Sequence, residues 1–281
     1  VVLMFELKYY LDFLHQHRVN CQAAGGIDQH HVHVGFAGFA DAGLEQAFLY
    51  AYPLYEIART GQNRAAQPGL NRMGHRAVLA DASMRAITAP NNDTIYSSAQ
   101  LELSGGPIEV NAPADLARYF NISFMDAFTD NFAAIGTGPT KGRGGRFWIA
   151  GPDWMGAAPA GVTVLRSSTN DVWMLGRIVV EGPADLPAAK ALQAQITISA
   201  TSDKPARAFA VKTTSAEDAE NFLAVVNEML SRSPGDKGHL ARRGLYMDVG
   251  ISGVVQRWRN WHAADRSNAA RTCGGGEDAV N

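Results

Sequence analysis

Short β-prone segments separated by turn residues occupy the middle of the chain, and this feature constrains the fold more than any other. The segments are rich in Val, Ile, Phe and Trp, and Gly, Pro or Asn stands between them. Turn signals at this spacing favour hairpins, because a parallel βαβ unit needs a long crossover, usually a helix. The sequence therefore predicts an antiparallel or mixed sheet. The predicted strands are 95–103, 108–110, 120–125, 147–150, 162–165 and 172–180.

Helical patterns stand on both sides of this region. Apolar residues recur at helical spacing from Asp41, a residue type that caps helices, to about residue 60, and Pro53 should kink that helix. Thr214 and Glu217 have the spacing of a capping box before another apolar stripe. We predict an α+β fold with a central, mostly antiparallel β-sheet over about 86–182. The predicted flanking helices are 41–60, 185–195 and 216–231.

The 281 residues predict one main domain with a segment on either side. Residues 1–40 end in a stretch rich in Gly and His and are assigned to an N-terminal extension. Residues 41–250 hold the predicted strands and helices, so they are assigned to a single α+β domain. Residues 251–281 are assigned to a C-terminal tail, partly disordered, because its end is polar and rich in glycine.

Charge and hydrophobicity argue against two classes of partner. Twenty-five Lys and Arg against 27 Asp and Glu give a net charge of −2, so no basic field exists to hold a nucleic acid. No apolar run approaches the roughly 18 residues of a membrane span, so we expect no integral membrane association. No intact secretion signal is visible, which leaves the cytoplasm open, and also the periplasm if a native signal was removed. The sequence identifies no cofactor, and it leaves open whether the chain forms a homo-oligomer.

The familiar motifs of hydrolases and nucleotide-binding proteins are absent from the sequence. It has no GxSxG, HExxH or SxxK pattern, and the glycine-rich segment 136–145 lacks the Gly directly before Lys141 that a phosphate-binding loop requires. We predict that segment as a mobile lid beside the site. His30, His31 and His33 could offer metal ligands, but further ligands are missing, so a loop or surface cluster of open role is expected. Whether a metal is bound is unknown.

Two polar clusters flank predicted strands and supply the candidate catalytic groups. Asn92, Asp93 and Tyr96 precede or begin one strand, and Asp126 and Asp130 follow another. Two carboxylates that face one cavity repel each other when ionised, so one pKa rises and the pair can act as acid and base. Carboxylates in surface turns are merely solvated. We expect Asp93 and Asp126 to converge in the fold.

Two arginines stand at or inside β-prone segments, where a cation is rare unless it is paired. They are Arg166 and Arg177, and each is expected to meet a carboxylate, in a structural ion pair or on the floor of a polar pocket. A buried guanidinium without a partner is costly, so Arg177 in particular should meet a carboxylate or a ligand anion. Asn92, Asp130 and Trp173 complete the set of candidate substrate-binding residues.

Several of these segments together carry a family resemblance. The runs are Ala47–Leu54, Pro90–Ser97, Asp126–Phe132, Gly151–Trp154, Gly161–Ser167 and Trp173–Arg177. Over about residues 41–198 the chain resembles the bacterial family called domain of unknown function 1254. The resemblance implies a fold and a set of positions, but no reaction. Members commonly carry a companion domain, 1214, which nothing after residue 250 resembles, so a short or a truncated form is expected.

Two hypotheses about function follow from these residues. The first is a small-molecule enzyme, with a hydrolase favoured among the enzyme classes. In it Asp126 activates water, and Asp93 or Asp130 is its acidic partner. Tyr96 would donate a proton, and one of the two arginines would stabilise developing negative charge. The alternative is a non-catalytic small-molecule binding module, exported or not. A pocket carboxylate with a raised pKa favours the enzyme, whereas fully paired, solvent-excluded carboxylates favour a binding or structural role.

Overall fold

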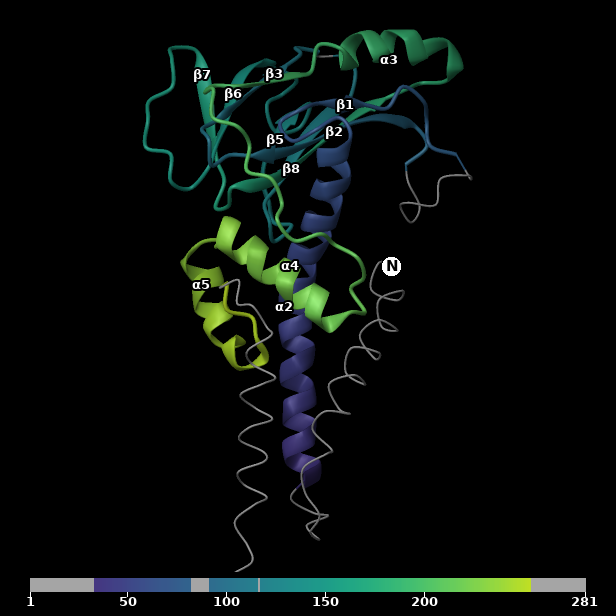
Figure 1. The fold of residues 1–281 in the computed structure, drawn as a ribbon. Coiled ribbons are helices and arrows are strands. Elements are labelled where there is room, and N and C mark those ends of the chain that lie inside the picture. Colours follow the sequence, from purple (N-terminus) through teal and green to yellow (C-terminus); the bar gives the residue numbers. More distant parts are fainter. Residues whose placement is uncertain (1–32, 82–90, 116, 254–281) are drawn as a thin grey trace, which may run out of the picture.

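The computed structural model of the protein describes residues 33–81, 91–115 and 117–253, with side chains from residue 43 onward. Within these residues the chain forms two β-sheets and a group of helices (Figure 1), which confirms the α+β class. The first sheet has the order β1-β2-β8-β4-β5, and the second has the order β7-β6-β3-β9. The strands are β1 (Gly74–His75), β2 (Thr94–Glu102), β3 (Ile108–Ala112), β4 (Phe120–Met125), β5 (Asn131–Gly136), β6 (Gly145–Ala150), β7 (Val162–Arg166), β8 (Asp171–Val179) and β9 (Thr197–Ala200).

The two sheets share the first hydrophobic core. Side chains alternate between the faces of a strand, so Ile95, Ala99 and Leu101 of β2 all point into this core, together with Ile149 of β6. The first sheet is antiparallel throughout, and the second is mixed because β6 and β7 are parallel. The prediction of one central sheet is wrong in this respect. Periodicity identifies strands but does not say which strands pair, and here the chain passes repeatedly from one sheet to the other.

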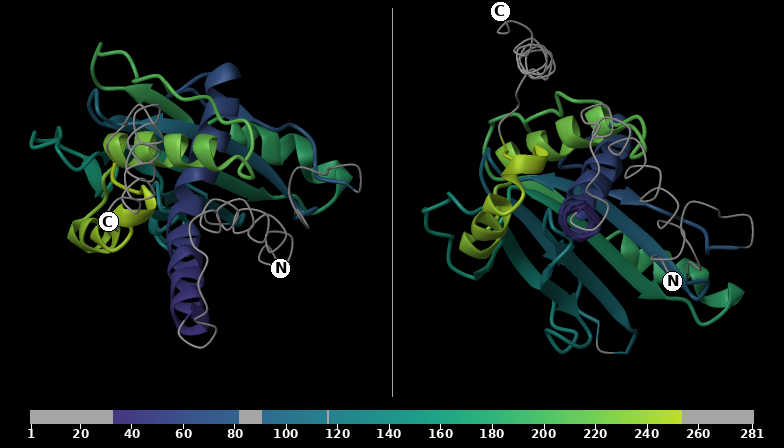
Figure 2. Two further views of the ribbon diagram at one scale, coloured as in Figure 1. Left: turned by 60° about the horizontal axis from the view of Figure 1, so that its bottom comes forward. Right: turned by 90° about the horizontal axis from the view of Figure 1, so that it is seen from below.

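A second hydrophobic core joins two helices to one end of the first sheet. The α-helices are α2 (His33–Ala66), α3 (Leu186–Gln193), α4 (Ala219–Arg232) and α5 (Lys237–Gly244). Helix α4 crosses α2 below the sheets, and the ring of Phe222 stacks there on Phe48 and Tyr55, at centroid distances of 5.2 and 5.4 Å. The right view of Figure 2 looks along α2, with α4 and α5 beside it. Helix α3 packs on the first core through Ala189 and Leu192.

The observed helices and strands differ from the predicted ones in extent and number. Helix α4 begins after Asp218, whose side chain accepts hydrogen bonds from two backbone N–H groups of the first turn. The predicted capping box at Thr214 is therefore wrong, because Asp218 lies closer to the apolar stripe and supplies the cap. Strands β1, β5 and β9 were not predicted. Helix α5 was missed because its sequence is polar and basic and has little apolar periodicity.

Some sequence predictions fall on residues that the structure does not describe. His30 and His31 lie outside the described residues, as does the tail after residue 253, and His33 is the first residue of α2. Among the described residues, no helix combines the length and apolar character needed to cross a membrane.

Candidate functional site

Asp126 lies in the tight turn between β4 and β5, and hydrogen bonds hold its carboxylate in place. The residue is only 3% exposed. Its Oδ1 accepts hydrogen bonds from the backbone N–H groups of Phe128 (2.9 Å) and Asp130 (3.0 Å), and its Oδ2 accepts one from Ser168 Oγ (2.7 Å). The structure thus brings Asp126 and Asp130 together in one turn. The solvent-excluded, hydrogen-bonded state of Asp126 is the state expected of a structural or binding role.

Asp93 lies at the opposite end of the first sheet from Asp126. Strand β2 begins opposite Val179, whereas β4 ends with Met125 opposite Trp173, six residues away along β8. Six residues of strand span roughly 20 Å. The prediction that the two carboxylates converge is therefore wrong. Both neighbours run antiparallel to β8, so the start of β2 and the end of β4 lie at opposite ends of the sheet.

The polar run before β2 forms a turn whose hydrogen bonds are local. The Asn91 side chain accepts a hydrogen bond from the backbone N–H of Asp93, and the hydroxyl of Tyr96 accepts one from the backbone N–H of Asn91, both at 3.1 Å. Asn92 and Asp93 are exposed. These contacts account for the polar residues here as a structural turn, which was one of the two interpretations of this run.

Arg177 and Trp173 lie on the face of β8 that points away from the first core. Arg177 is exposed, and its guanidinium carbon lies 5.9 Å from the centroid of the Tyr96 ring. It forms no ion pair within the part of the chain that the structure describes, so the prediction that Arg177 is buried against a carboxylate is wrong. The reason is strand alternation, which directs every second side chain of β8 outward. Trp173 packs on the second core and donates its indole N–H to Ser98 Oγ (2.9 Å).

The glycine-rich segment 136–145 lies at the other end of β4 from Asp126. Gly136 is opposite Asn121 near the start of β4, whereas Asp126 follows the end of that strand. The backbone N–H of Gly142 donates to the carbonyl of Gly136 (3.1 Å), which closes the segment into a turn. The position of this segment therefore contradicts the prediction that it forms a lid over Asp126. Sequence spacing alone could not show which end of the strand this segment extends.

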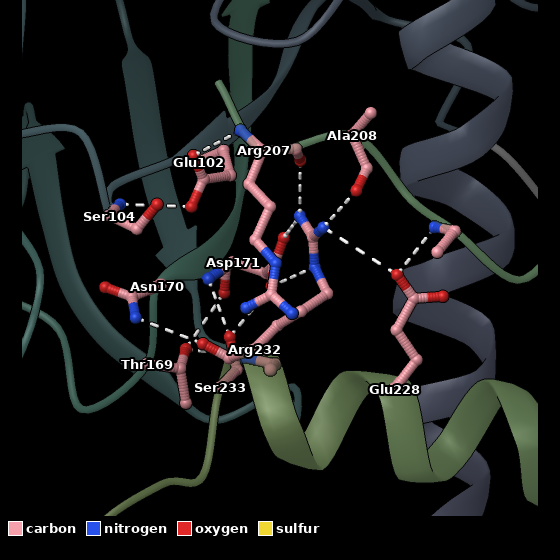
Figure 3. Close-up of polar contacts among 12 residues, drawn as sticks. Glu102, Ser104, Thr169, Asn170, Asp171, Arg207, Ala208, Glu228, Arg232 and Ser233 are labelled. Atoms are coloured by element: carbon pink, nitrogen blue, oxygen red, sulfur yellow. Dashed lines mark hydrogen bonds and ion pairs between the residues drawn. The ribbon is translucent and has the colours of Figure 1, made fainter. Parts of the chain in front are cut away.

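A buried network of charged side chains ties the end of α4 to the start of β8 (Figure 3). The side chain of Arg232 is 1% exposed, and that of Asp171 is 0% exposed. Arg232 donates to both carboxylate oxygens of Asp171, from Nε (3.1 Å) and from Nη2 (2.8 Å). It also donates to the carbonyls of Arg207 (2.9 Å) and Ala208 (2.7 Å), and Ser233 Oγ donates to Asp171 (2.9 Å). Each of the three guanidinium nitrogens is therefore engaged, as a buried cation requires.

The same network anchors three neighbouring pieces of chain. Buried Glu102 accepts hydrogen bonds from the backbone N–H groups of Ser104 (3.0 Å) and Arg207 (2.8 Å), one on each carboxylate oxygen. The side-chain amide of Asn170 donates to the carbonyl of Arg232 (3.0 Å). The turn after β2, the segment before Arg207 and the residue before β8 are thus fixed to a rigid base (Figure 3).

A surface pocket of about 240 Å³ is lined by these anchored pieces of chain. Its lining includes the turn 103–106, Asn170, Lys204 and, from the segment after β6, Asp153, Trp154 and Met155. Lys204 and Asp153 are exposed and form no hydrogen bond or ion pair among the described residues. Their charged groups are therefore available to a ligand.

Arg166 is a predicted site residue that contacts the lining of this pocket. Its Nη1 donates to the carbonyl of Trp154 (2.8 Å), and its guanidinium carbon lies 5.4 Å from the centroid of the indole ring. It therefore holds Trp154 in place, through a hydrogen bond and a cation–π contact. Together, Lys204, Arg166 and Asp153 give the region a local charge of about +1, which favours an anion.

Sequence reasoning missed most of this site, although some signals existed. Glu228 and Arg232 stand four residues apart around an apolar stripe, and charges at that spacing on a buried face indicate an internal ion pair; their nearest atoms lie 3.9 Å apart. Asp153 and Trp154 belong to a run that carries the family resemblance. Lys204 has no local signal, because it reaches the pocket through an irregular segment far from the other residues in sequence.

The fold and the pocket define an α+β protein in which two sheets and a helical layer enclose two cores. Residues 70–200, which contain all of the strands described above, match the family model "Protein of unknown function (DUF1254)". The chain thus contains a domain of the DUF1254 family, as the resemblance indicated. No curated protein matches the chain.

Solved structures show a related fold. The VPA0106 protein from Vibrio parahaemolyticus matches with a TM-score of 0.56 and 25% identity, over 73% of this chain and 50% of that one. The chain therefore spans about half the length of that protein. A protein from Burkholderia cenocepacia, described as uncharacterized, matches with a TM-score of 0.33 and 10% identity, over 50% of this chain and 37% of the other. That second likeness carries no argument about the fold.

Proposed function

We propose that the protein binds a small organic acid in the pocket beside Trp154 and acts there as a binding module. The observation that carries the proposal is a contrast within the site. The walls of the pocket are anchored to a fully hydrogen-bonded network, while Lys204 and Asp153 at its surface have no partner among the described residues. Walls that are already fixed lower the entropic cost of binding, and free charged groups supply the specific contacts.

The chemistry of the lining suggests the class of ligand. Lys204 offers ammonium donors to a carboxylate, and the guanidinium of Arg166 adds positive charge beside the indole. Trp154 and Met155 offer apolar surface to a planar or aliphatic group. A volume of about 240 Å³ is below the roughly 300–1,000 Å³ of sites for drug-sized ligands. A simple aromatic acid is the kind of molecule that suits this pocket.

The hydrolase hypothesis has less support from the geometry. It requires a carboxylate at an accessible cavity, but Asp126 is buried and accepts three hydrogen bonds. Asp93 is too far from Asp126 to share a proton with it, and neither residue lines the pocket. Asp130 lies close to Asp126 but is likewise outside the pocket lining. We therefore favour binding over hydrolysis by paired carboxylates.

Benzoate titrations of matched lysine variants test the proposal. We expect the wild-type protein to bind benzoate measurably by calorimetry, with Lys204→Met weakening the affinity about tenfold through loss of a charged hydrogen bond. Lys141→Met, at an exposed lysine of the 136–145 segment outside the pocket, is the control and should bind like wild type. Benzamide, the neutral analogue, should bind more weakly than benzoate and respond little to either change. Equal benzoate affinities in the two variants would contradict the proposal.

A further inference from the structure

We propose a second site, for a divalent transition-metal ion, at Asp126, Asp130 and His239. Each residue offers a ligand atom, and these three atoms lie within 4.8 Å of one another. His239 Nε2 lies 3.5 Å from Asp130 Oδ2. None of the three lines the pocket beside Trp154, so this site is independent of the proposed binding of an acid.

The imidazole of His239 is fixed with one nitrogen toward the carboxylates. Its ring stacks on Phe128 at a centroid distance of 3.6 Å and an angle of 15°, and the hydroxyl of Tyr50 donates to the His239 carbonyl (3.1 Å). Nδ1 is buried and has no hydrogen-bond partner among the described residues. Only Nε2 therefore makes a polar contact, and it faces Asp130. A histidine held in this way is oriented before any ion binds.

The carboxylate of Asp126 is also held in place by hydrogen bonds, and it can still coordinate a metal ion. A carboxylate oxygen has two lone pairs, and Oδ2 accepts one hydrogen bond, from Ser168. The backbone N–H groups on Oδ1 and the hydroxyl on Oδ2 would form an outer shell that orients the carboxylate toward the ion. Because Asp126 also shapes the turn, the position of Asp130 depends on the same contacts.

Asp130 supplies the adjustable side of the site. Its side chain is 72% exposed, whereas that of His239 is 12% exposed. Ligand atoms about 2.1 Å from one metal ion lie at most about 4.2 Å apart, so any pair of these atoms that is farther apart must move closer on binding. The exposed Asp130 side chain can make that movement, and its open side leaves coordination positions for water.

The donor set favours a particular class of ion. One imidazole nitrogen and two carboxylate oxygens suit Zn²⁺ or Mn²⁺, whereas Ca²⁺ and Mg²⁺ prefer oxygen ligands alone. An ion here would connect α5, which carries His239, to the turn between β4 and β5. It would therefore stabilise the attachment of α5 to the first sheet, by a free energy that grows with the logarithm of its affinity.

The test uses the full chain without an affinity tag, with His30, His31 and His33 changed to Gln so that this cluster does not compete for metal. In that background, Asp130→Asn removes one ligand, and Asp203→Asn is the matched control at another exposed aspartate. We expect Zn²⁺ to bind one to one by calorimetry in the background and control proteins, and at least tenfold more weakly after Asp130→Asn.

A second measurement locates the ion. Added Mn²⁺ should broaden the backbone amide signals of Phe128 and His239 before those of residues elsewhere. The proposal is overturned by absence of Zn²⁺ binding, by equal affinity in the two aspartate variants, or by Phe128 signals that Mn²⁺ leaves sharp; Asp130 and His239 would then form only a local polar contact. Because the pocket shares no residue with this site, each of these results leaves the benzoate test unaffected.

Discussion

The network around Arg232 and the pocket beside Trp154 are neighbours that use charge in opposite ways. In the network, a 1% exposed guanidinium meets a carboxylate and backbone carbonyls, and all three of its nitrogens are engaged. In the pocket, Lys204 and Asp153 are exposed and have no partner among the described residues. The saturated charges therefore hold the structure together, whereas the open charges are free to contact a ligand.

The largest loss of stability is expected from breaking the buried ion pair between Arg232 and Asp171. Arg232→Met should lower the free energy of unfolding by about 3–5 kcal/mol, because it leaves the Asp171 carboxylate buried without its partner. Urea denaturation measures this. Arg146→Met, which removes an exposed ion pair with Glu109, is the control and should cost less than about 1 kcal/mol. Similar losses in the two variants would show that the network does not hold the structure as described.

A smaller loss of stability is expected at Glu102, which links the buried network to the wall of the pocket. Glu102→Gln turns an amide donor toward a backbone N–H, so it should cost about 1–3 kcal/mol of stability and also weaken benzoate binding. Stability is read from urea denaturation and affinity from calorimetry. Glu56→Gln on α2, away from the pocket, should leave the affinity unchanged. Normal benzoate binding by the Glu102 variant would separate the pocket from the network.

The partly exposed ion pair between Arg118 and Asp185 should stabilise the protein to an extent that depends on pH. Hydrogen bonds from Arg118, and next from the backbone N–H of Glu181, lower the pKa of Asp185 from 3.8 to about 2. A lowered pKa in the folded state means that the stabilisation is complete above the unfolded value and is lost as the pH falls toward 2. The Tm of Asp185→Asn should therefore lie below that of wild type at pH 6, and the difference should shrink as the pH falls below 3.8 and vanish only below about pH 2. A difference independent of pH would contradict this.

The smallest effect is expected at Arg177. Because this side chain is exposed and forms no ion pair with any described residue, Arg177→Gln should change stability by no more than about 0.5 kcal/mol. Benzoate affinity should also stay at the wild-type value. Loss of benzoate binding with normal stability would move the ligand site to the outer face of the first sheet, where Arg177 and Trp173 lie.

Local features were predictable from the sequence, and features that depend on strand pairing were not. Turn residues between β-prone runs indicated the α+β class, and Asp126 and Asp130 meet because only three residues of one turn lie between them. Whether Asp93 joins them depends on the register of β2 and β4 against β8, which periodicity does not determine. The assignment of residues 41–250 to a single domain stays a prediction.

Binding of an acid beside Trp154 can be followed at the indole ring itself. In a ¹⁵N-labelled protein, the signals of the indole N–H groups are followed during a benzoate titration, and Trp154→Phe identifies the signal of interest. We expect a saturable shift of the Trp154 signal. In the Lys204→Met variant this shift should require higher benzoate concentrations. The signal of Trp173 should stay in place, since its indole N–H is bonded to Ser98 away from the pocket. A shift at Trp173 without one at Trp154, or no shift at all, would contradict the account.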